Sequence, residues 1–273
     1  TFDEKTFISS TGALALEKVP KHMIIIGAGV IGLELGAVYR RLGSEITVIE
    51  YFDRICPSLD GEIGKEFHKY LKKDGFKILL NKKCLKGVKN GDGLAAVDIE
   101  DVKTGAKETV IGDVCLIATG RKPYVEGLGV DKLGIKLDKQ GRVPINARFQ
   151  TSVPNVFAIG DAIEGPMLAH KAEEEGIAVA ELLSGHSIHL DYNNIPGVVY
   201  TDPEIAFVGK TSEQLKAEGV AFKEGKFPFS ANSRSVSNLS DAPGLVKILV
   251  DSGSQKILGA HIMCSGAGEM IHE

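Results

Sequence analysis

The sequence lacks closely spaced cysteines and any excess of basic residues. Its cysteines stand at positions 56, 84, 115 and 264, so no C-x-x-C pair is present for a zinc knuckle or a local redox disulfide, and no metal site is predicted. Their wide spacing, and the apolar run around Cys115, indicate reduced, structural thiols of an intracellular protein. Lys and Arg total 32 against 36 Asp and Glu, a formal net charge of -4, which gives the chain no bulk attraction to nucleic acid.

Long apolar runs are also absent. The longest apolar runs are short, such as the one at 23–26, and fall far below the roughly eighteen residues that are needed to cross a membrane. Hydrophobic residues make up 43% of the chain and charged residues 25%, which is typical of a globular protein and excludes a disordered or fibrous one. With 273 residues the chain suits one large domain or two modest ones, and its 32 glycines predict many tight turns.

Strands and helices alternate from residue 23 onward. The pattern predicts strands at 23–26, 46–49, 76–80 and 114–118, helices at 30–42 and from about 60 to 74, and hairpin strands on either side of the Gly-Asp-Gly at 91–93. Ser58 or Asp60 could cap the second helix. This β-α-β-α-β order predicts an α/β fold, in which helices cover a parallel sheet of the nucleotide-binding type.

Two further blocks follow. The block from residue 141 is expected to hold a strand at 156–159 and a helix from 166 to 183. From residue 195 the pattern becomes antiparallel α+β, with strands at 195–200, 205–208, 245–250 and 256–262, one short helix at 211–218, and a last helix over 266–273. Residues 1–21 show no compact pattern of their own.

The strongest motif is the G-A-G-V-I-G of residues 27–32, which follows a strand and opens a helix. Gly27 permits the tight turn, Gly29 lets backbone amides approach a pyrophosphate, and Gly32 allows close packing of the helix against the strand. Glu50, at the end of the next strand, can accept hydrogen bonds from ribose hydroxyls and would repel a 2′-phosphate, so the motif favours NAD(H) over NADP(H). The alternative is a packing turn with a surface glutamate.

Four other positions leave two interpretations open. Glu34 is either a solvated acid in the first turns of the helix or a carboxylate near the nicotinamide. The turn at 119–123, which includes Gly120, either meets a cofactor or simply ends a strand. Asp161 is either a capping residue or an acceptor for a ribityl hydroxyl. His170 is either a satisfied helix residue or a catalyst, whereas His272 and Glu273 point to different helix faces and form no dyad.

Several segments resemble the dihydrolipoyl dehydrogenase family of flavin-dependent disulfide oxidoreductases. They are residues 9–14, 27–34, 155–161, 165–176 and 226–234. The resemblance covers essentially the whole chain. It implies a Rossmann-like FAD/NAD(P)-binding fold followed by a dimerisation domain, a homodimer, and an enzyme that passes electrons from dihydrolipoyl groups of 2-oxoacid dehydrogenase complexes through a redox disulfide and FAD to NAD⁺. It also implies the mitochondrial matrix or a bacterial cytoplasm.

The resemblance further assigns roles to individual residues. It places a set of NAD contacts at Gly27, Ala28, Gly29, Val30, Ile31, Gly32, Glu34, Glu50, Cys84 and Gly120. It places flavin contacts at Asp161, Met167, Leu168, Ala169 and His170. Glu34 becomes an auxiliary acid beside the flavin and nicotinamide. The implied domains are the end of an FAD-domain segment (1–20), an NAD-binding domain (21–140), a returning FAD-domain segment (141–194) and a partial interface domain (195–273).

The departures from the family concern its catalytic parts. The chain has one G-x-G-x-x-G where the family has a second for FAD, and no two of its cysteines are five positions apart. The His-Pro segment that carries the family's catalytic base has no counterpart. The sequence therefore predicts an internal portion of such an enzyme with no catalytic residue, inactive alone. The alternatives are an NADH-dependent sister oxidoreductase and a non-catalytic NAD-binding module.

Overall fold

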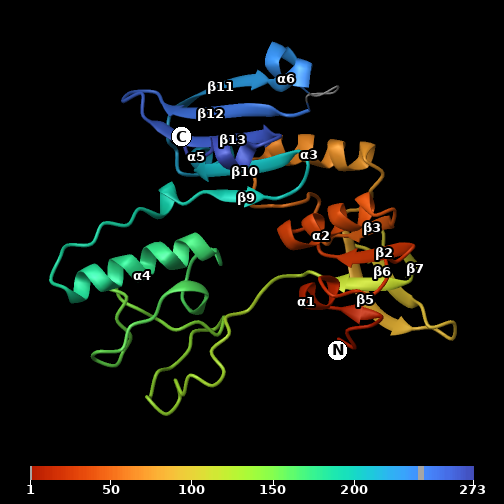
Figure 1. Cartoon of the computed structure of the whole chain (residues 1–273), viewed down its shortest axis with the longest axis horizontal. Coiled ribbons are helices and arrows are strands. Elements are labelled where there is room, and N and C mark those ends of the chain that lie inside the picture. The colour runs from red at the N-terminus through yellow and green to blue at the C-terminus, as the bar shows by residue number, and fades with distance from the viewer. Residues whose placement is uncertain (1, 239–242) are drawn as a thin grey trace. The chain divides into compact units, whose positions relative to one another are not determined.

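The computed structural model describes residues 2–238 and 243–273 and separates into two compact units (Figure 1). Unit 1 comprises Thr1–Gly120 and Pro196–Glu273, and unit 2 comprises Arg121–Ile195. Among the described residues, no helix has both the length and the apolar character needed to cross a membrane.

A five-stranded, all-parallel sheet forms the centre of the first part of unit 1. Its strands, in spatial order, are β1 (Phe7–Ile8), β8 (Val114–Ile117), β2 (His22–Ile26), β3 (Glu45–Ile49) and β4 (Lys77–Leu79). The four strands predicted from the alternating pattern are confirmed. The fifth, β1, is an addition, since a two-residue edge strand carries too little periodicity to be recognised.

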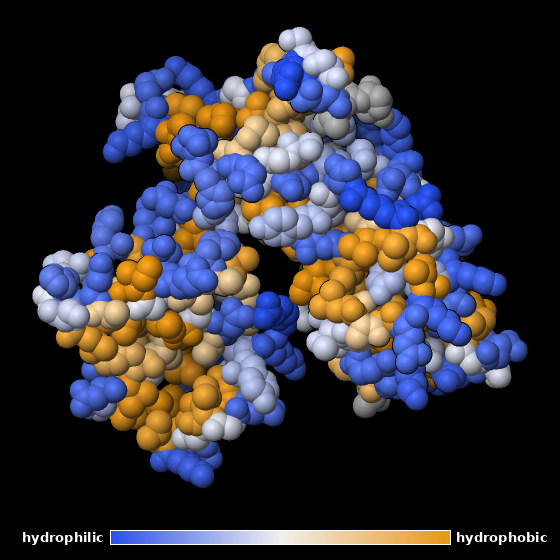
Figure 2. Space-filling view, in the orientation of Figure 1, coloured by the Kyte–Doolittle hydropathy of each residue, from blue (hydrophilic) through white to orange (hydrophobic). Residues whose placement is uncertain are grey.

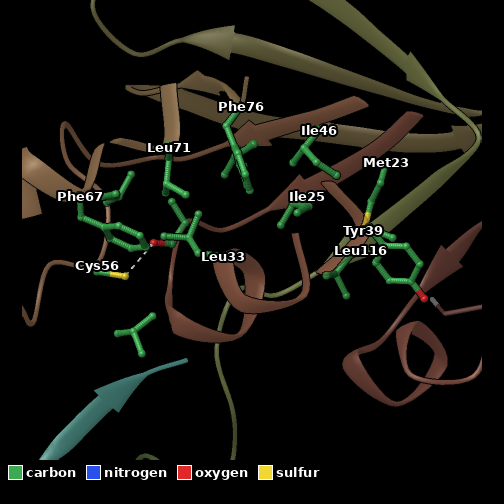
Figure 3. Close-up of a cluster of buried hydrophobic side chains, with 14 of the residues drawn as sticks. Met23, Ile25, Leu33, Tyr39, Ile46, Cys56, Phe67, Leu71, Phe76 and Leu116 are labelled. Carbon is green, nitrogen blue, oxygen red and sulfur yellow. Dashed lines mark hydrogen bonds between the residues drawn. The ribbon is translucent and has the colours of Figure 1, made fainter. Parts of the chain in front are cut away.

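Helices cover one face of this sheet. They are α1 (Ser10–Ala13), α2 (Val30–Arg41) and α3 (Gly61–Lys73). On α3 the apolar residues Ile63, Phe67 and Leu71 recur at helical spacing and are all buried. They meet Met23 and Ile25 of β2 in one cluster, of which Figure 3 gives a close view.

A small antiparallel sheet covers the other face. It consists of β5 (Lys82–Lys89), β6 (Ala95–Asp101) and β7 (Lys107–Gly112). Because neighbouring residues of a strand point to opposite faces, Ile24 of β2 packs here, with Val97 and Ile99, while its neighbours face the helices. The hairpin predicted around residues 91–93 is thereby confirmed.

The second part of unit 1 is an antiparallel five-stranded sheet, which we call the interface sheet. Its strands, in spatial order, are β11 (Phe222–Pro228), β12 (Leu245–Asp251), β13 (Ile257–Cys264), β10 (Glu204–Gly209) and β9 (Gly197–Val199). The helices α5 (Ser212–Ala217), α6 (Ser233–Asn238) and α7 (Ala267–Met270) accompany it. Strand β11 was not predicted, because it is an exposed edge strand rich in Lys, Glu and Gly. The last helix has a single turn rather than two.

Unit 2 is mostly loop, with the helix α4 (Ala169–Leu183) and two short 3₁₀ turns, Gly160–Ala162 and Tyr192–Asn194. The strand expected at 156–159 is wrong: only a single bridge joins Gln150 to Phe157, and the apolar side chains there pack into a local cluster without a neighbouring strand. The helix expected from 166 begins at Ala169, because Leu168 is extended. Figure 2 shows hydrophobic residues on the surface of the loops before α4, where Leu128, Leu133 and Leu137 are exposed.

The interface sheet contains a buried histidine beside a buried lysine. His261 of β13 is 1% exposed and lies directly across from Lys247 of β12. Its Nε2 lies 3.0 Å from the carbonyl oxygen of Lys210 and therefore donates to it, while Nδ1 has no partner among the described residues. Burial lowers the pKa of His261, so the ring is neutral in the folded chain.

This histidine makes the stability of the fold depend on pH. The unfolded chain binds the proton first, at a pKa of about 6.5, so the free energy of unfolding is highest above that pH and falls as the pH drops below it. We expect the loss between pH 7.5 and 5.5, measured by urea unfolding, to be about 1 kcal/mol larger in the wild type than in His261→Gln. Burial also lowers the pKa of His68, but that residue is common to both proteins. Equal losses in the two proteins would contradict the assignment.

Candidate functional site

A cavity of about 470 Å³ opens at the carboxyl ends of the parallel strands β2, β3 and β8. Its walls come from these strand ends, the glycine-rich turn and the start of β5; the lining residues are Ile26, Gly27, Gly29, Ile49, Glu50, Tyr51, Phe52, Pro57, Lys82, Lys83, Cys84, Ala118, Thr119 and Gly120. Ligands of open parallel sheets bind at this edge. Five residues predicted to contact NAD therefore meet around one cavity: Gly27, Gly29, Glu50, Cys84 and Gly120.

The three glycines of the turn occupy different surroundings. Gly27 has a φ of +103°, and a Cβ on it would lie 2.5 Å from the Ala118 carbonyl oxygen. A Cβ on Gly32 would lie 2.5 Å from the Gly27 carbonyl oxygen and 3.0 Å from Ile25. Gly29 is the N-cap of α2, has a φ of -80°, and would place its Cβ in open space. The first and third glycines thus shape the turn, while the second leaves room beside the start of α2.

The start of α2 offers unpaired backbone donors. Gly29 provides no side-chain cap, so the N–H groups of the first turn have no capping acceptor. Together with the positive end of the helix dipole, such a terminus is a favourable place for a phosphate group.

Glu50 holds the turn in place while it faces the cavity. The residue is 7% exposed. Its Oε2 accepts a hydrogen bond from the Ala28 N–H at 2.6 Å, and its Oε1 accepts one from the Phe52 N–H at 2.8 Å. Each carboxylate oxygen has a second lone pair, so both can still accept from a ligand hydroxyl. The sequence predicted the ligand-facing role but not the two bonds to the backbone.

The mouth of the cavity has an aromatic and a basic side. Tyr51 and Phe52 are each more than half exposed and meet edge to face, with ring centroids 5.4 Å apart. Lys82 forms ion pairs with Asp101 at 3.2 Å and with Glu108 at 3.1 Å. These wall residues were not predicted from the sequence. Tyr51 and Phe52 could have been, because they directly follow Glu50, which was predicted to contact the ligand.

Cys84 also belongs to this wall. Its thiol is half-buried, and burial raises its pKa. The other three cysteines are buried, and burial raises the pKa of Cys56 and that of Cys115 to about 12. All four are free thiols in the described structure. No cluster of three or more metal-ligating side chains occurs among residues 2–238 and 243–273.

The remaining residues predicted to contact NAD do not line the cavity. Ala28 belongs to the turn, and Val30, Ile31 and Gly32 form the first residues of α2. The half-buried Glu34 accepts a hydrogen bond from the Tyr200 N–H at 2.7 Å, and burial raises its pKa. Its carboxylate therefore connects α2 to the chain just after β9.

The predicted flavin contacts lie together in unit 2. Asp161 accepts from the Arg121 guanidinium at 2.8 Å, and Met167 to His170 lead into and begin α4. The adjacent Gly160 is held on both sides by a fully buried ion pair. Glu175 accepts from its N–H at 2.7 Å, Lys171 donates to its carbonyl at 3.0 Å, and the two side chains lie 2.8 Å apart. Sequence analysis missed this pair, whose i,i+4 spacing is also that of ordinary surface pairs.

Comparison with family models gives two matches along the chain. Residues 1–176 match the model described as pyridine nucleotide-disulphide oxidoreductase. Residues 195–273 match the model of the dimerisation domain of the same group.

Curated relatives and solved structures agree with these matches. The chain is 55% identical over its whole length to "Dihydrolipoyl dehydrogenase, mitochondrial" of Caenorhabditis elegans, of which it covers 55%, and 52% identical to the Homo sapiens protein of that name, of which it covers 54%. It thus spans about half the length of the curated relatives that it matches. Among solved structures, the HOCl-induced flavoprotein disulfide reductase RclA from Escherichia coli is similar, with a TM-score of 0.87 and 27% identity over 99% of this chain and 60% of that one.

The surroundings of Gly29 and Gly32 predict that one added methyl group affects stability very differently at the two positions. We expect Gly32→Ala to lower the free energy of unfolding by about 2 kcal/mol, because its Cβ would meet backbone and a β2 side chain. Gly29→Ala should change it by less than about 0.5 kcal/mol, because nothing lies within 4 Å of the added atom. Urea unfolding of both variants checks this, and an equal loss of stability would contradict the described geometry.

Proposed function

This chain belongs to the pyridine nucleotide-disulphide oxidoreductase family, and we propose that it carries the NAD site of a dihydrolipoyl dehydrogenase. The observation that supports the proposal is the cavity at the carboxyl edge of the parallel sheet, where Gly29, Glu50 and Gly120 meet. The identity of 52–55% to proteins named dihydrolipoyl dehydrogenase favours this enzyme over a sister disulfide reductase such as RclA, at 27%.

Each part of the cavity suits one part of NAD. The open amides at the start of α2 would bind the pyrophosphate, and the bare Gly29 would let it approach the backbone. The free lone pairs of Glu50 would accept from the adenosine ribose hydroxyls, and its charge would repel a 2′-phosphate. Tyr51 and Phe52 give the adenine base an apolar surface. In the proposed site Ala28, Val30, Ile31 and Gly32 form the turn, Cys84 and Gly120 the walls, and Glu34 an auxiliary acid.

The residues of unit 2 fit part of a flavin site. Asp161 presents a carboxylate beside the fixed Gly160 turn, and the predicted contacts Met167 to His170 lead into and begin α4. We assign Asp161, Met167, Leu168, Ala169 and His170 to FAD, whose chemistry when bound is the two-electron relay between disulfide and nicotinamide. The buried pair of Lys171 and Glu175 would orient this segment, since it holds both backbone polar groups of Gly160.

The wider assignment follows the relatives. We propose oxidation of dihydrolipoyl groups as the activity of the whole enzyme, 2-oxoacid dehydrogenase complexes as its partners, and a homodimer formed through the dimerisation domain. The relatives named mitochondrial favour the mitochondrial matrix. The four-part division at residues 20, 140 and 194 belongs to the same proposal.

The first test is dinucleotide binding. We expect the chain to bind NADH, detected by nicotinamide fluorescence, at least about tenfold more tightly than NADPH, because a 2′-phosphate would meet the charge of Glu50. Gly29→Ala should weaken NADH binding by more than about tenfold while the fold is kept, since its methyl group would occupy the space of the pyrophosphate. The matched control is Gly225→Ala on β11, where a Cβ also meets nothing within 4 Å. Equal NADH affinity of the three proteins would refute the site.

The second test concerns turnover. The 273 residues contain no pair of cysteines five positions apart to accept electrons from a dithiol. We therefore expect the purified chain to be colourless and to reduce no lipoamide with NADH, followed by absorbance at 340 nm. Lipoamide reduction by the chain alone would show that a different pair of thiols or a different acceptor operates.

A further inference from the structure

Residues 51–60, which we call the strap, connect β3 to α3 and line one side of the cavity through Tyr51, Phe52 and Pro57. We propose that Asp60 is a positioning residue for the dinucleotide site: the interface sheet, through Lys247, holds the strap and thereby the backbone of the glycine-rich turn. This inference rests on the proposed NAD site. It adds that the affinity for NAD depends on a buried ion pair that does not line the cavity.

Near its middle, at Cys56, the strap holds the glycine-rich turn. The Cys56 N–H donates to the Ala28 carbonyl at 2.9 Å, and the Cys56 thiol lies 3.5 Å from the same oxygen, as the dashed line in Figure 3 marks. The Ala28 N–H donates to Glu50. Both backbone polar groups of Ala28, which stands between the first two glycines of the motif, are therefore fixed by Glu50 and the strap.

The strap cannot hold this position by local preference alone. Cys56 has a φ of +37°, in the left-handed region that residues other than glycine rarely adopt. Such a backbone persists only where its surroundings hold it. Ile55 and Leu59 supply part of this support, since they are buried in the same cluster as Val199 and Ile205 of the interface sheet.

At its last residue the strap is attached to the interface sheet by one carboxylate. Asp60 is fully buried, and Lys247 of β12 donates to its two oxygens at 2.9 and 3.1 Å. The same carboxylate accepts from the Glu62 N–H in the first turn of α3 and from the Ser212 N–H at the start of α5, each at 3.1 Å. Three elements thus converge on Asp60, and removal of Lys247 would leave a buried charge without its main partner.

These contacts predict two positions of the strap, one seated and one released. Only the seated strap presents the Cys56 N–H to Ala28 and so gives the turn the geometry that a pyrophosphate needs. A ligand that binds one of two states shows an affinity reduced by the fraction of the protein in that state. If loss of the ion pair leaves about one molecule in ten seated, NADH binds about tenfold more weakly.

The experiment compares matched variants of the complete 273-residue chain. Lys247→Met removes the buried partner, and Lys247→Arg keeps the charge. Arg41→Met is the control, because Arg41 on α2 pairs with Asp202 near the interface sheet at 2.6 Å, but in an exposed ion pair away from the strap. At a temperature where circular dichroism shows every variant folded, we expect NADH to bind about tenfold more weakly to Lys247→Met and within twofold of wild type to the other two.

Amide hydrogen exchange gives a second readout, independent of any ligand. In Lys247→Met, peptides that contain Ala28 and Cys56 should exchange faster than in wild type, while Arg41→Met leaves them unchanged. If Lys247→Met does not fold, Asp60→Asn replaces it, since asparagine removes the charge while its single carbonyl oxygen still accepts from one of the two amides, Glu62 or Ser212.

The outcomes separate the inference from the proposed function. Lower urea resistance of Lys247→Met with unchanged NADH affinity and unchanged exchange would reduce the ion pair to a structural role and overturn the inference. If wild type binds no NADH, the proposed function fails, while the exchange at Ala28 and Cys56 still decides whether the interface sheet holds the strap.

Discussion

The carboxylate of Glu50 connects the parts on which the proposed site depends. It stands at the end of β3, accepts the Ala28 N–H and the Phe52 N–H, and borders the cavity. A buried carboxylate is costly unless its oxygens are hydrogen-bonded, and here two backbone amides provide those bonds. The charge that would select NAD is thus also the charge that joins the glycine-rich turn to the strap, so cofactor choice and loop geometry cannot vary independently at this position.

The same device recurs at two other turns. Asp60 joins the starts of α3 and α5 to β12, and Glu175 with Lys171 holds the backbone of Gly160. In each case a buried charged side chain binds backbone groups of a turn that hydrophobic packing could not orient, since packing is not directional. Replacement of both members of a buried ion pair by apolar residues of similar volume can leave stability unchanged, whereas loss of one member leaves a buried charge without its partner and lowers stability. A change in the position of the turn is expected in either case, and a ligand or an exchange measurement reveals it.

What could be predicted from the sequence was mostly local. The turn at 27–32 is contiguous and lies between a recognisable strand and helix, so both its place at the sheet edge and the presence of Glu50 in the wall of the cavity could be expected. The exposed edge strand β11 lacks the apolar alternation that marks a strand, and the apolar run at 156–159 resembles one although it packs in a local cluster. Apolar periodicity indicates which residues are buried. A strand also requires hydrogen bonds to an adjacent strand, and periodicity gives no information about that neighbour.

The contacts between distant residues escaped prediction for a different reason. Asp60, which the structure shows as the N-cap of α3, was one of two candidate caps in the sequence, but Lys247, 187 positions later, looks in sequence like any lysine on a strand. The sequence therefore does not show which lysine pairs with Asp60, because only the fold brings the two residues together. The glycine-rich turn gives the complementary case, because its sequence is sufficient to recognise the site. The contacts that keep Ala28 in place, however, come from residues 50 and 56. The strap that contains residue 56 is in turn packed against the interface sheet. A dinucleotide motif can therefore be complete in sequence and still depend for its geometry on a sheet that begins more than 150 residues later.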